Sequence, residues 1–151
     1  MDENQFRSFC ETLIGKPYIF GAEGPDSFDC SGLAVFVLAH LGIEHEGRST
    51  RGLHRYFVEN GHGAPVDEHD VGLGDLCFYT NAEGRICHIT VGWGGGQVFE
   101  AGRGDETTTT VAEARARGAE VMIADLHRHA HFKDAVRPHG LPWRTGLGLS
   151  V

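Results

Sequence analysis

A thiol stands directly before an uninterrupted apolar segment in the N-terminal third of the chain. Residues 28–32 read Phe-Asp-Cys-Ser-Gly, and residues 33–39 are all apolar. Aspartate is a preferred N-cap, so Asp29 predicts a helix that holds Cys30 in its first turn. The N–H groups of that turn have no helical partner and the helix dipole is positive there, which stabilises a thiolate. The pattern therefore predicts a nucleophilic Cys30. A buried structural cysteine is the alternative, because cysteine is among the most buried residue types.

A histidine and a carboxylate later in the chain could complete a thiol-based catalytic site. His88 lies in a predicted strand, residues 86–91, whose side chains alternate between the two faces of a sheet. Glycines at 94–96 turn the chain, so the next predicted strand runs back beside it and can place Glu100 on the face of His88. A thiol, an imidazole and a carboxylate would serve as nucleophile, base and orienting group. The spacing alone also fits a histidine at the surface or one that is hydrogen-bonded in the core.

The elements that must position these residues are helical in the N-terminal half of the chain. Apolar spacing and capping residues predict three helices, over residues 4–14, residues 30 to about 42, and residues from Ser49 or Thr50 to Asn60. The apolar stripe of the first helix consists of Phe6, Phe9, Cys10, Leu13 and Ile14. Cys10 is therefore expected to pack in the core, and Gly42 is expected to end the second helix in the left-handed conformation.

The second half of the chain is predicted to be mostly extended. Residues 61–74 are expected to form a loop, and strands are expected at 76–79, 86–91, 97–100 and 121–124. A short helix capped by Thr110 and ended by Gly118 interrupts them. The fold class is therefore α+β, with N-terminal helices packed on an antiparallel β-meander. Residues 138–151 form a tail without an assignment.

Length, charge and cysteine content narrow the class of protein. A chain of 151 residues predicts a single domain, residues 1–151, with its own core. The net charge of −8 argues against nucleic acid or an anionic membrane as the main partner. The sequence has no apolar run of about 18 residues, so no membrane insertion is expected. The acidic start, residues 1–4, does not resemble a signal peptide, which predicts synthesis in the cytoplasm.

Four cysteines are too few for a disulfide scaffold, so reduced thiols are expected.

An ordered set of segments resembles the NlpC-type cysteine peptidases, papain-like enzymes that cut peptidoglycan stem peptides. The segments are Leu13-Ile14-Gly15-Lys16-Pro17-Tyr18, Phe28-Asp29-Cys30-Ser31-Gly32-Leu33, Gly74-Asp75-Leu76-Cys77-Phe78-Tyr79 and His88-Ile89-Thr90-Val91-Gly92. Their order and spacing match over roughly residues 5–105. The resemblance implies a papain-like NlpC-type fold and a catalytic domain, and it favours the nucleophilic reading of the cysteine over the structural one.

The resemblance also implies roles for single residues. Cys30 is similar to the family nucleophile and His88 to its general base. Tyr18 matches the family tyrosine that lies near the thiol and can donate to the oxyanion. The backbone N–H groups of Cys30 and its neighbour Ser31 would supply the rest of that hole. The third polar residue of the family lies twelve positions after its histidine, which is Glu100 here.

Glu100 departs from the family pattern, which usually has histidine and less often asparagine or glutamine at that position. A carboxylate can still accept the second imidazole N–H and orient the ring. Its negative charge would also favour the imidazolium form of His88, and with it the Cys30 thiolate. The alternative is that Glu100 is a surface carboxylate and that the third residue is another one, such as Asp105.

The implied reaction is acyl transfer through a thioester, and it requires no metal or other cofactor. The implied substrate is the bond between γ-D-glutamate and diaminopimelate, or lysine, in a peptidoglycan stem peptide. That peptide carries carboxylates, so cationic subsites are expected. Arg48, Arg51 and Arg103 are candidates for substrate binding, although each is also typical of a solvated surface charge.

Three histidines at alternate positions, His127, His129 and His131, are not explained by this reading. On a strand they would share a face and could bind a transition metal. No adjacent cysteine or carboxylate pattern supports a structural zinc site, so solvated side chains are the favoured interpretation and no metal site is predicted.

Two functions of other classes remain open. The chain could be a catalytically silent module that binds wall peptide or a partner protein, or an amidase or acyltransferase that acts on a non-wall substrate. A wall enzyme made without a signal peptide would need delivery by a phage tail, a secretion system or lysis. Intracellular recycling of wall peptides is the other expectation, and the oligomeric state is not predicted.

Overall fold

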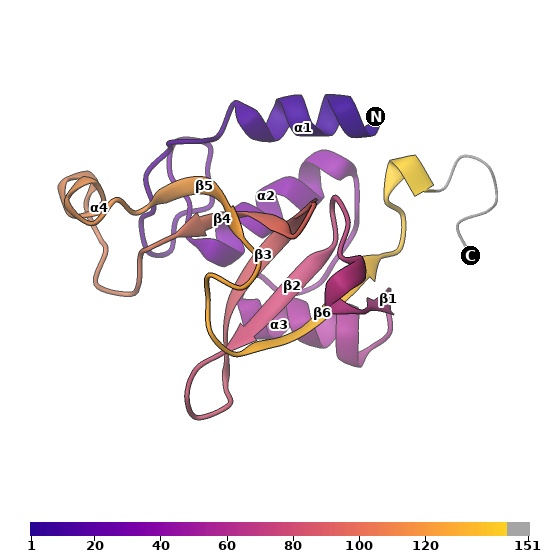
Figure 1. The fold of residues 1–151 in the computed structure, drawn as a ribbon. Helices are drawn as coiled ribbons and strands as arrows, with labels where there is room; N and C mark the ends of the chain where they lie inside the picture. Colours follow the sequence, from indigo (N-terminus) through magenta and orange to yellow (C-terminus); the bar gives the residue numbers. More distant parts are fainter. Residues whose placement is uncertain (145–151) are drawn as a thin grey trace.

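The computed structural model describes residues 1–144, and the last seven positions of the unassigned tail lie outside the described residues. A six-stranded antiparallel sheet in the order β1-β6-β2-β3-β4-β5 forms the centre of the fold, with α2 and α3 packed on β3 (Figure 1). The helices are α1 (Glu3–Glu11), α2 (Cys30–Leu41), α3 (Thr50–His54) and α4 (Val111–Arg117), with short turns η1 (Arg55–Glu59), η2 (Glu68–Asp70) and η3 (Pro142–Arg144). The strands are β1 (Gly63–Val66), β2 (Leu76–Thr80), β3 (Ile86–Gly94), β4 (Gln97–Gly102), β5 (Glu120–Asp125) and β6 (Phe132–Pro138).

Alternating residues of the central strands build two separate apolar clusters. One lies between the helices and one face of the sheet, and it includes Leu33, Val37, Phe78, Ile89 and Phe99. The other, on the opposite face, contains Cys77, Tyr79, Val98, Leu126 and Ala135. Alternation therefore assigns every second residue of a strand to each cluster, as expected for a sheet with two covered faces. The α+β class with an antiparallel meander is confirmed.

Several predicted boundaries are confirmed by the capping contacts. Gly42 ends α2 with φ 72°, in the left-handed region that glycine adopts without steric cost. Ser49, rather than Thr50, caps α3. Thr110 caps α4 and Gly118 ends it. Cys10 is fully buried, as its place on the apolar stripe of α1 predicts.

Two expectations about the fold are wrong, and one strand was not predicted. Ile14 is exposed because α1 ends at Glu11, before the helical spacing can turn this side chain inward. Residues 61–74 are not only loop, since β1 pairs with β6 at the edge of the sheet. Pro65 fits there because an edge strand leaves one row of N–H groups without a partner strand. The strand β6 itself was not predicted, although it pairs with both β1 and β2.

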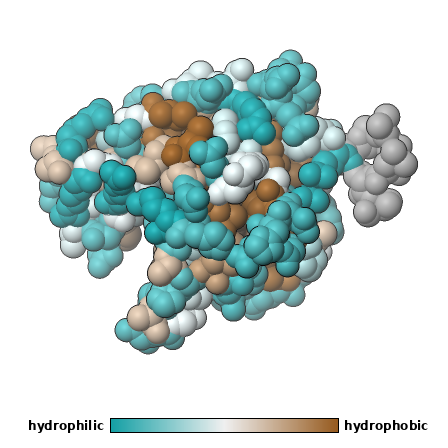
Figure 2. All heavy atoms as spheres, viewed as in Figure 1, coloured by the Kyte–Doolittle hydropathy of each residue, from teal (hydrophilic) through white to brown (hydrophobic). Residues whose placement is uncertain are grey.

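The surface shows few apolar side chains. Among residues 1–144, no helix has both the length and the hydropathy that crossing a bilayer requires. Figure 2 shows a mostly hydrophilic face on which the hydrophobic atoms gather in small, separate areas.

A buried ion pair joins β2 to β6. Asp75, which is fully buried just before β2, accepts hydrogen bonds from Arg137 Nε and Nη2, both at 2.9 Å, and from the backbone N–H of Gly72 at 2.8 Å. Hydrogen bonding to Asp75 raises the pKa of the Arg137 guanidinium, so the guanidinium stays charged. This bidentate contact fixes β6 beside β2 from a residue of the Gly-Asp-Leu segment.

We expect Asp75→Ala to lower the free energy of unfolding by about 3–5 kcal/mol, because it leaves a partly buried guanidinium without its counter-charge. Chemical denaturation followed by circular dichroism measures this change. Glu83→Ala, in the exposed hairpin turn between β2 and β3, is the control and should change the value by no more than about 0.5 kcal/mol. Equal midpoints for the two variants would contradict a structural role of the pair.

Candidate active site

The start of α2 is fixed by the two oxygens of the Asp29 carboxylate. Oδ1 accepts the backbone N–H of Gly32 at 2.7 Å, which makes Asp29 the N-cap, as predicted. Oδ2 accepts the N–H of Gly21 at 2.8 Å, and the Ser31 hydroxyl donates to Oδ1 at 3.3 Å. One side chain thus joins the loop at residues 21–28 to the first turn of the helix, where Cys30 lies. The Ser31 hydroxyl is part of the cap, and its backbone N–H remains the candidate for the oxyanion.

Gly32 allows this loop to lie directly on the helix. A Cβ atom at this position would collide with the carbonyl oxygen of Ala22. The same carbonyl accepts the backbone N–H of Asp29 at 2.9 Å. The glycine of the Asp-Cys-Ser-Gly segment therefore has a steric reason, which is the close approach of the backbone of the loop.

Cys30 is partly buried among three side chains that come from different elements. Its Sγ lies 3.7 Å from the Thr50 hydroxyl at the start of α3. The ring of His88, near the start of β3, interacts with the same thiol. Tyr18 is also close enough for the charge of Cys30 to affect its pKa. Sequence reasoning considered Thr50 only as a helix cap and missed its contact with the thiol.

His88 is held between the thiol and Glu100, as the strand alternation predicts. Its Nε2–H donates to Glu100 Oε1 at 3.1 Å, which leaves Nδ1 as the ring nitrogen available to Cys30. Burial lowers the pKa of His88, but the interactions with Cys30 and Glu100 raise it more, so the net shift is upward. The imidazolium form, and the stability it contributes, is therefore present below this raised pKa and is lost as the pH rises through it.

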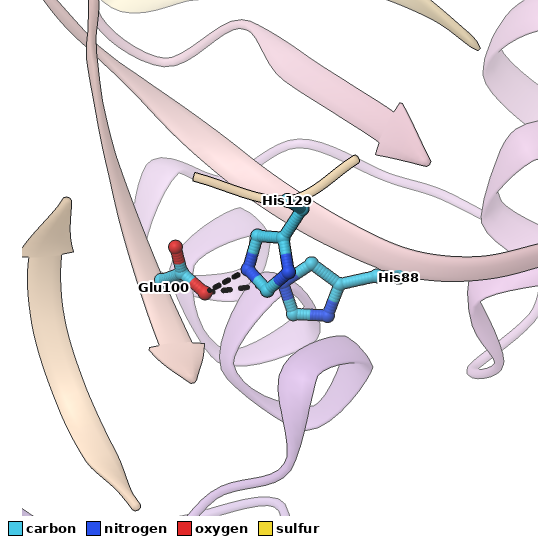
Figure 3. Close-up of side chains that lie close together, drawn as sticks. All are labelled: His88, Glu100 and His129. Atoms are coloured by element: carbon cyan, nitrogen blue, oxygen red, sulfur yellow. Dashed lines mark hydrogen bonds and ion pairs between the residues drawn. The ribbon is translucent and has the colours of Figure 1, made fainter. Parts of the chain in front are cut away.

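Glu100 carries a fully buried side chain that three cationic or donor groups surround. Besides His88, His129 Nε2 lies 2.7 Å and Arg128 Nη2 3.2 Å from the same oxygen, Oε1. Figure 3 shows the two imidazole rings converging on this carboxylate. Burial raises the pKa of Glu100, but the hydrogen bonds from His129 and His88 outweigh burial and hold the pKa well below its ordinary value. Glu100 is therefore ionised at neutral pH.

The three histidines at alternate positions do not share a strand. Residues 126–131 form turns and bends between β5 and β6. His127 pairs with Glu68 at 3.2 Å, His131 adopts φ 63°, and His129 reaches Glu100. The expectation of solvated side chains is wrong for His129, whose side chain is only 25% exposed. Its partner is 29 residues away in the sequence, so local spacing gave no signal for this contact.

Asp105, the alternative third residue, is engaged in its own loop. Its carboxylate accepts the backbone N–H and hydroxyl of Thr107 and lies 3.3 Å from Arg117 Nη1. These hydrogen bonds hold the pKa of Asp105 below its usual value. Of the two carboxylates considered from the sequence, the structure places Glu100 against His88.

Tyr18 is buried beside the thiol. A Cβ atom at Gly104 would overlap its ring, so the backbone of the loop after β4 packs on the phenol face. Burial raises the pKa of Tyr18, and the charges of Cys30 and Asp29 raise it further. The phenol therefore remains protonated at neutral pH and can donate its hydrogen.

The three candidate arginines lie in different surroundings. Arg48 forms an ion pair with Glu23, which ties the segment before α3 to the loop that precedes Cys30. Arg51 is exposed in α3, directly after Thr50. Arg103 is exposed after β4 with φ 66°, one residue before Gly104. Arg51 and Arg103 are chain neighbours of Thr50 and Gly104, which contact Cys30 and Tyr18, and the Arg103 guanidinium lies near Gly118 at the end of α4.

This arrangement provides the parts of a thiol-based acyl-transfer site. The thiol is at a helix N-terminus, the imidazole can take and return its proton, and an ionised carboxylate orients the imidazole. A protonated phenol and the N–H groups of the first helical turn are available for a developing oxyanion.

Known proteins resemble this chain in sequence and in fold. The model of the NlpC/P60 family matches residues 15–125. A "probable endopeptidase p60" of Listeria grayi is 34% identical over 88 residues, which cover 58% of this chain and 16% of that protein. The chain therefore spans less than a fifth of that relative.

Solved structures share the fold. An NlpC/P60 family protein from Bacillus cereus aligns over 94% of this chain and 41% of its own, with a TM-score of 0.71 and 21% identity. The NlpC/p60 domain of the peptidoglycan hydrolase SagA aligns over 90% of this chain and 98% of its own, with a TM-score of 0.63 and 23% identity. At these identities the matches show a common fold.

The four cysteines should differ strongly in their reaction with iodoacetamide. Burial raises the pKa of Cys10 and of Cys77 to about 12, so these thiols stay protonated near pH 7 and react slowly. Burial also raises the pKa of Cys87, although this side chain is exposed. We expect Cys30 to be alkylated first, measured by peptide mass spectrometry over time.

Glu100→Gln should slow alkylation of Cys30 about tenfold near pH 7, because the variant removes a charge that favours the His88 imidazolium and so the thiolate. The matched control, Glu120→Gln, changes a carboxylate of β5 and should leave the rate unchanged. An unchanged rate in Glu100→Gln, in a folded protein, would remove Glu100 from this role.

Proposed function

Because the chain belongs to the NlpC/P60 family, we propose that it is a cysteine endopeptidase that hydrolyses peptidoglycan stem peptides. The observation that carries this proposal is the thiol of Cys30 beside His88, whose other nitrogen is held by the buried Glu100 carboxylate. The names of the Listeria relative and of the SagA structure, an endopeptidase and a peptidoglycan hydrolase, support the reaction class and the substrate class.

The chemistry would proceed through a thioester. The Cys30 thiolate attacks the carbonyl carbon of the scissile amide, and the negative oxygen receives hydrogen bonds from Tyr18 and the first-turn N–H groups. His88 gives its proton to the leaving amine, so the C–N bond breaks and the acyl group stays on sulfur. The now neutral His88 takes a proton from water, whose oxygen attacks the thioester carbon. The C–S bond then breaks, which releases the acid product and restores the Cys30 thiolate beside the His88 imidazolium.

The bond between γ-D-glutamate and diaminopimelate, or lysine, is the proposed target. This part of the stem peptide carries free carboxylates next to the scissile amide. Arg51 and Arg103 are exposed cations that neighbour Thr50 and Gly104 in the chain, and they are the proposed partners of these carboxylates. Arg48 is already paired with Glu23 and would shape the loop instead.

The test is digestion of diaminopimelate-type peptidoglycan by the wild type and by Cys30→Ala, with the products identified by mass spectrometry. We expect peptide fragments with a new N-terminal diaminopimelate from the wild type and none from the variant. If neither protein releases fragments while both are folded, the proposal fails. Saturable binding of wall peptide without cleavage would then point to the silent binding module.

Tyr18→Phe should lower kcat about 10- to 100-fold with little change in KM, because the phenol acts on the oxyanion and not on the bound amide. The matched control is Tyr56→Phe, which alters a tyrosine that stacks on the His62 ring at 4.0 Å. Activity assays at several substrate concentrations separate the two constants. Equal kcat for both variants would show that Tyr18 has only a packing role.

A further inference from the structure

Three ligand-type atoms from distant parts of the chain converge beside Cys30. They are Nε2 of His88 in β3, Oε1 of Glu100 in β4 and Nε2 of His129 in the turn between β5 and β6. All of them lie within 4.8 Å of one another (Figure 3). His129 lies beyond residues 15–125, which the family model matches, so that match does not include this third group.

The chemistry of these donors fits a transition-metal dication. Two imidazoles and one carboxylate are ligands that Zn²⁺ accepts, at about 2.0–2.2 Å from the ion. Tetrahedral ligands at that distance lie about 3.4 Å apart. The atom pairs here are separated by 3.1 Å for His88 and Glu100, and by 2.7 Å for His129 and Glu100. An ion would therefore take the place of the hydrogen-bonded protons and widen each of the two pairs with Glu100 by less than one ångström. The His88 and His129 nitrogens, which lie within 4.8 Å of each other, would settle near the same separation of about 3.4 Å.

The rings are held in place but remain accessible. The centroids of the His88 and His129 rings are 4.1 Å apart, and Tyr79 lies beside both, at 5.7 and 5.3 Å. The Tyr79 hydroxyl donates to the carbonyl of Leu126 at 2.8 Å, which fixes the start of the turn that carries His129. The side chains of His88 and His129 are 14% and 25% exposed, so an ion can enter from solvent.

One group opposes a cation at this position. Arg128 Nη2 lies 3.2 Å from Glu100 Oε1 and 3.3 Å from His129 Nε2. Its positive charge compensates Glu100 in the absence of a metal. Binding of a dication requires the guanidinium to move outward, which its 29% exposed side chain allows. Glu100 Oε2 is buried and accepts no hydrogen bond from residues 1–144, so a rotation of the carboxylate toward the ion would break no hydrogen bond of this oxygen.

We propose that His88, Glu100 and His129 form an inhibitory binding site for Zn²⁺ or a similar transition-metal dication. The ion bonds to Nε2 of both histidines and releases the protons that these nitrogens share with Glu100. His88 then carries its one remaining proton on Nδ1. With the metal on Nε2, this ring has no free lone pair, so it can accept neither the Cys30 proton nor a proton from the attacking water. Giving its Nδ1 proton to the leaving amine would leave an imidazolate, which makes that step unfavourable. The inhibition rests on the proposed peptidase function, whereas the binding does not.

The experiment titrates ZnCl₂ and, separately, MgCl₂ into the full chain by isothermal calorimetry. The Cys87→Ser background removes an exposed thiol that could bind zinc by itself. We expect one zinc ion per chain and no magnesium. His129→Gln should weaken zinc binding by about 10- to 100-fold or more, since loss of an outer-sphere partner alone costs that much. The matched control is His127→Gln, a neighbouring histidine that pairs with Glu68, and it should bind as the background does.

Two further variants test which groups hold the metal and which oppose it. Cys30→Ala should keep the zinc affinity, because the thiol is not a ligand. CoCl₂ added to the Cys87→Ser protein, in which Cys30 is intact, should give no thiolate charge-transfer band. Arg128→Gln should tighten zinc binding, since it removes the opposing charge. Peptidoglycan digestion should stop over the same zinc concentrations that saturate the site and resume after addition of a chelator.

The outcomes that overturn the proposal differ from those that overturn the peptidase function. No saturable zinc binding below about 1 mM, or equal affinity in His129→Gln and His127→Gln, would rule out the site. Loss of binding in Cys30→Ala together with a thiolate band would assign the metal to the cysteine instead. A protein that binds zinc as described but never cleaves peptidoglycan would retain the site and lose only its inhibitory meaning.

Discussion

The hydrogen bonds of one carboxylate, that of Asp29, determine where the reactive thiol lies. One oxygen caps the first turn of α2 and the other holds the loop that arrives from Tyr18. The contact between Gly32 and the Ala22 carbonyl brings the backbone of the loop against the helix, with no room for a side chain between them. The nucleophile is therefore positioned by backbone contacts around it, and its own side chain remains available for His88.

The charge of Glu100 is the second requirement, because a buried carboxylate is stable only when donors and cations surround it. His88 supplies one donor from the neighbouring strand, which the register of β3 and β4 fixes. The turn between β5 and β6 supplies the other two, His129 and Arg128. That turn is held by Tyr79, and β6 behind it is held by the ion pair of Asp75 and Arg137. The orientation of His88 thus depends on the C-terminal strand of the sheet.

The sequence predicts best the features that depend on neighbours in the chain. The capping role of Asp29, the left-handed Gly42 and the shared face of His88 and Glu100 follow from local steric rules and from strand alternation. The contacts of Thr50, Arg128 and His129 could not be predicted in this way, because they form only when the sheet brings distant segments together. The strand β6 was missed for the same reason. Its charged residues, Lys133, Asp134 and Arg137, obscure its apolar alternation, and its pairing with β2 crosses more than fifty residues of chain.

Position 100 carries a glutamate, whose negative charge a neutral or imidazole side chain would not supply. This charge changes the electrostatics of the whole site. If His88 alone balanced Glu100, the imidazolium would be neutralised by the carboxylate, and a Cys30 thiolate would add an uncompensated negative charge. Arg128 removes this conflict, since its permanent charge balances Glu100 and leaves the imidazolium of His88 to balance the thiolate. His129 adds a further hydrogen bond to the same carboxylate oxygen, at 2.7 Å. Each negative charge of the reactive state therefore has an opposite charge beside it, the thiolate facing the imidazolium and Glu100 facing Arg128, which is what a water-poor environment requires.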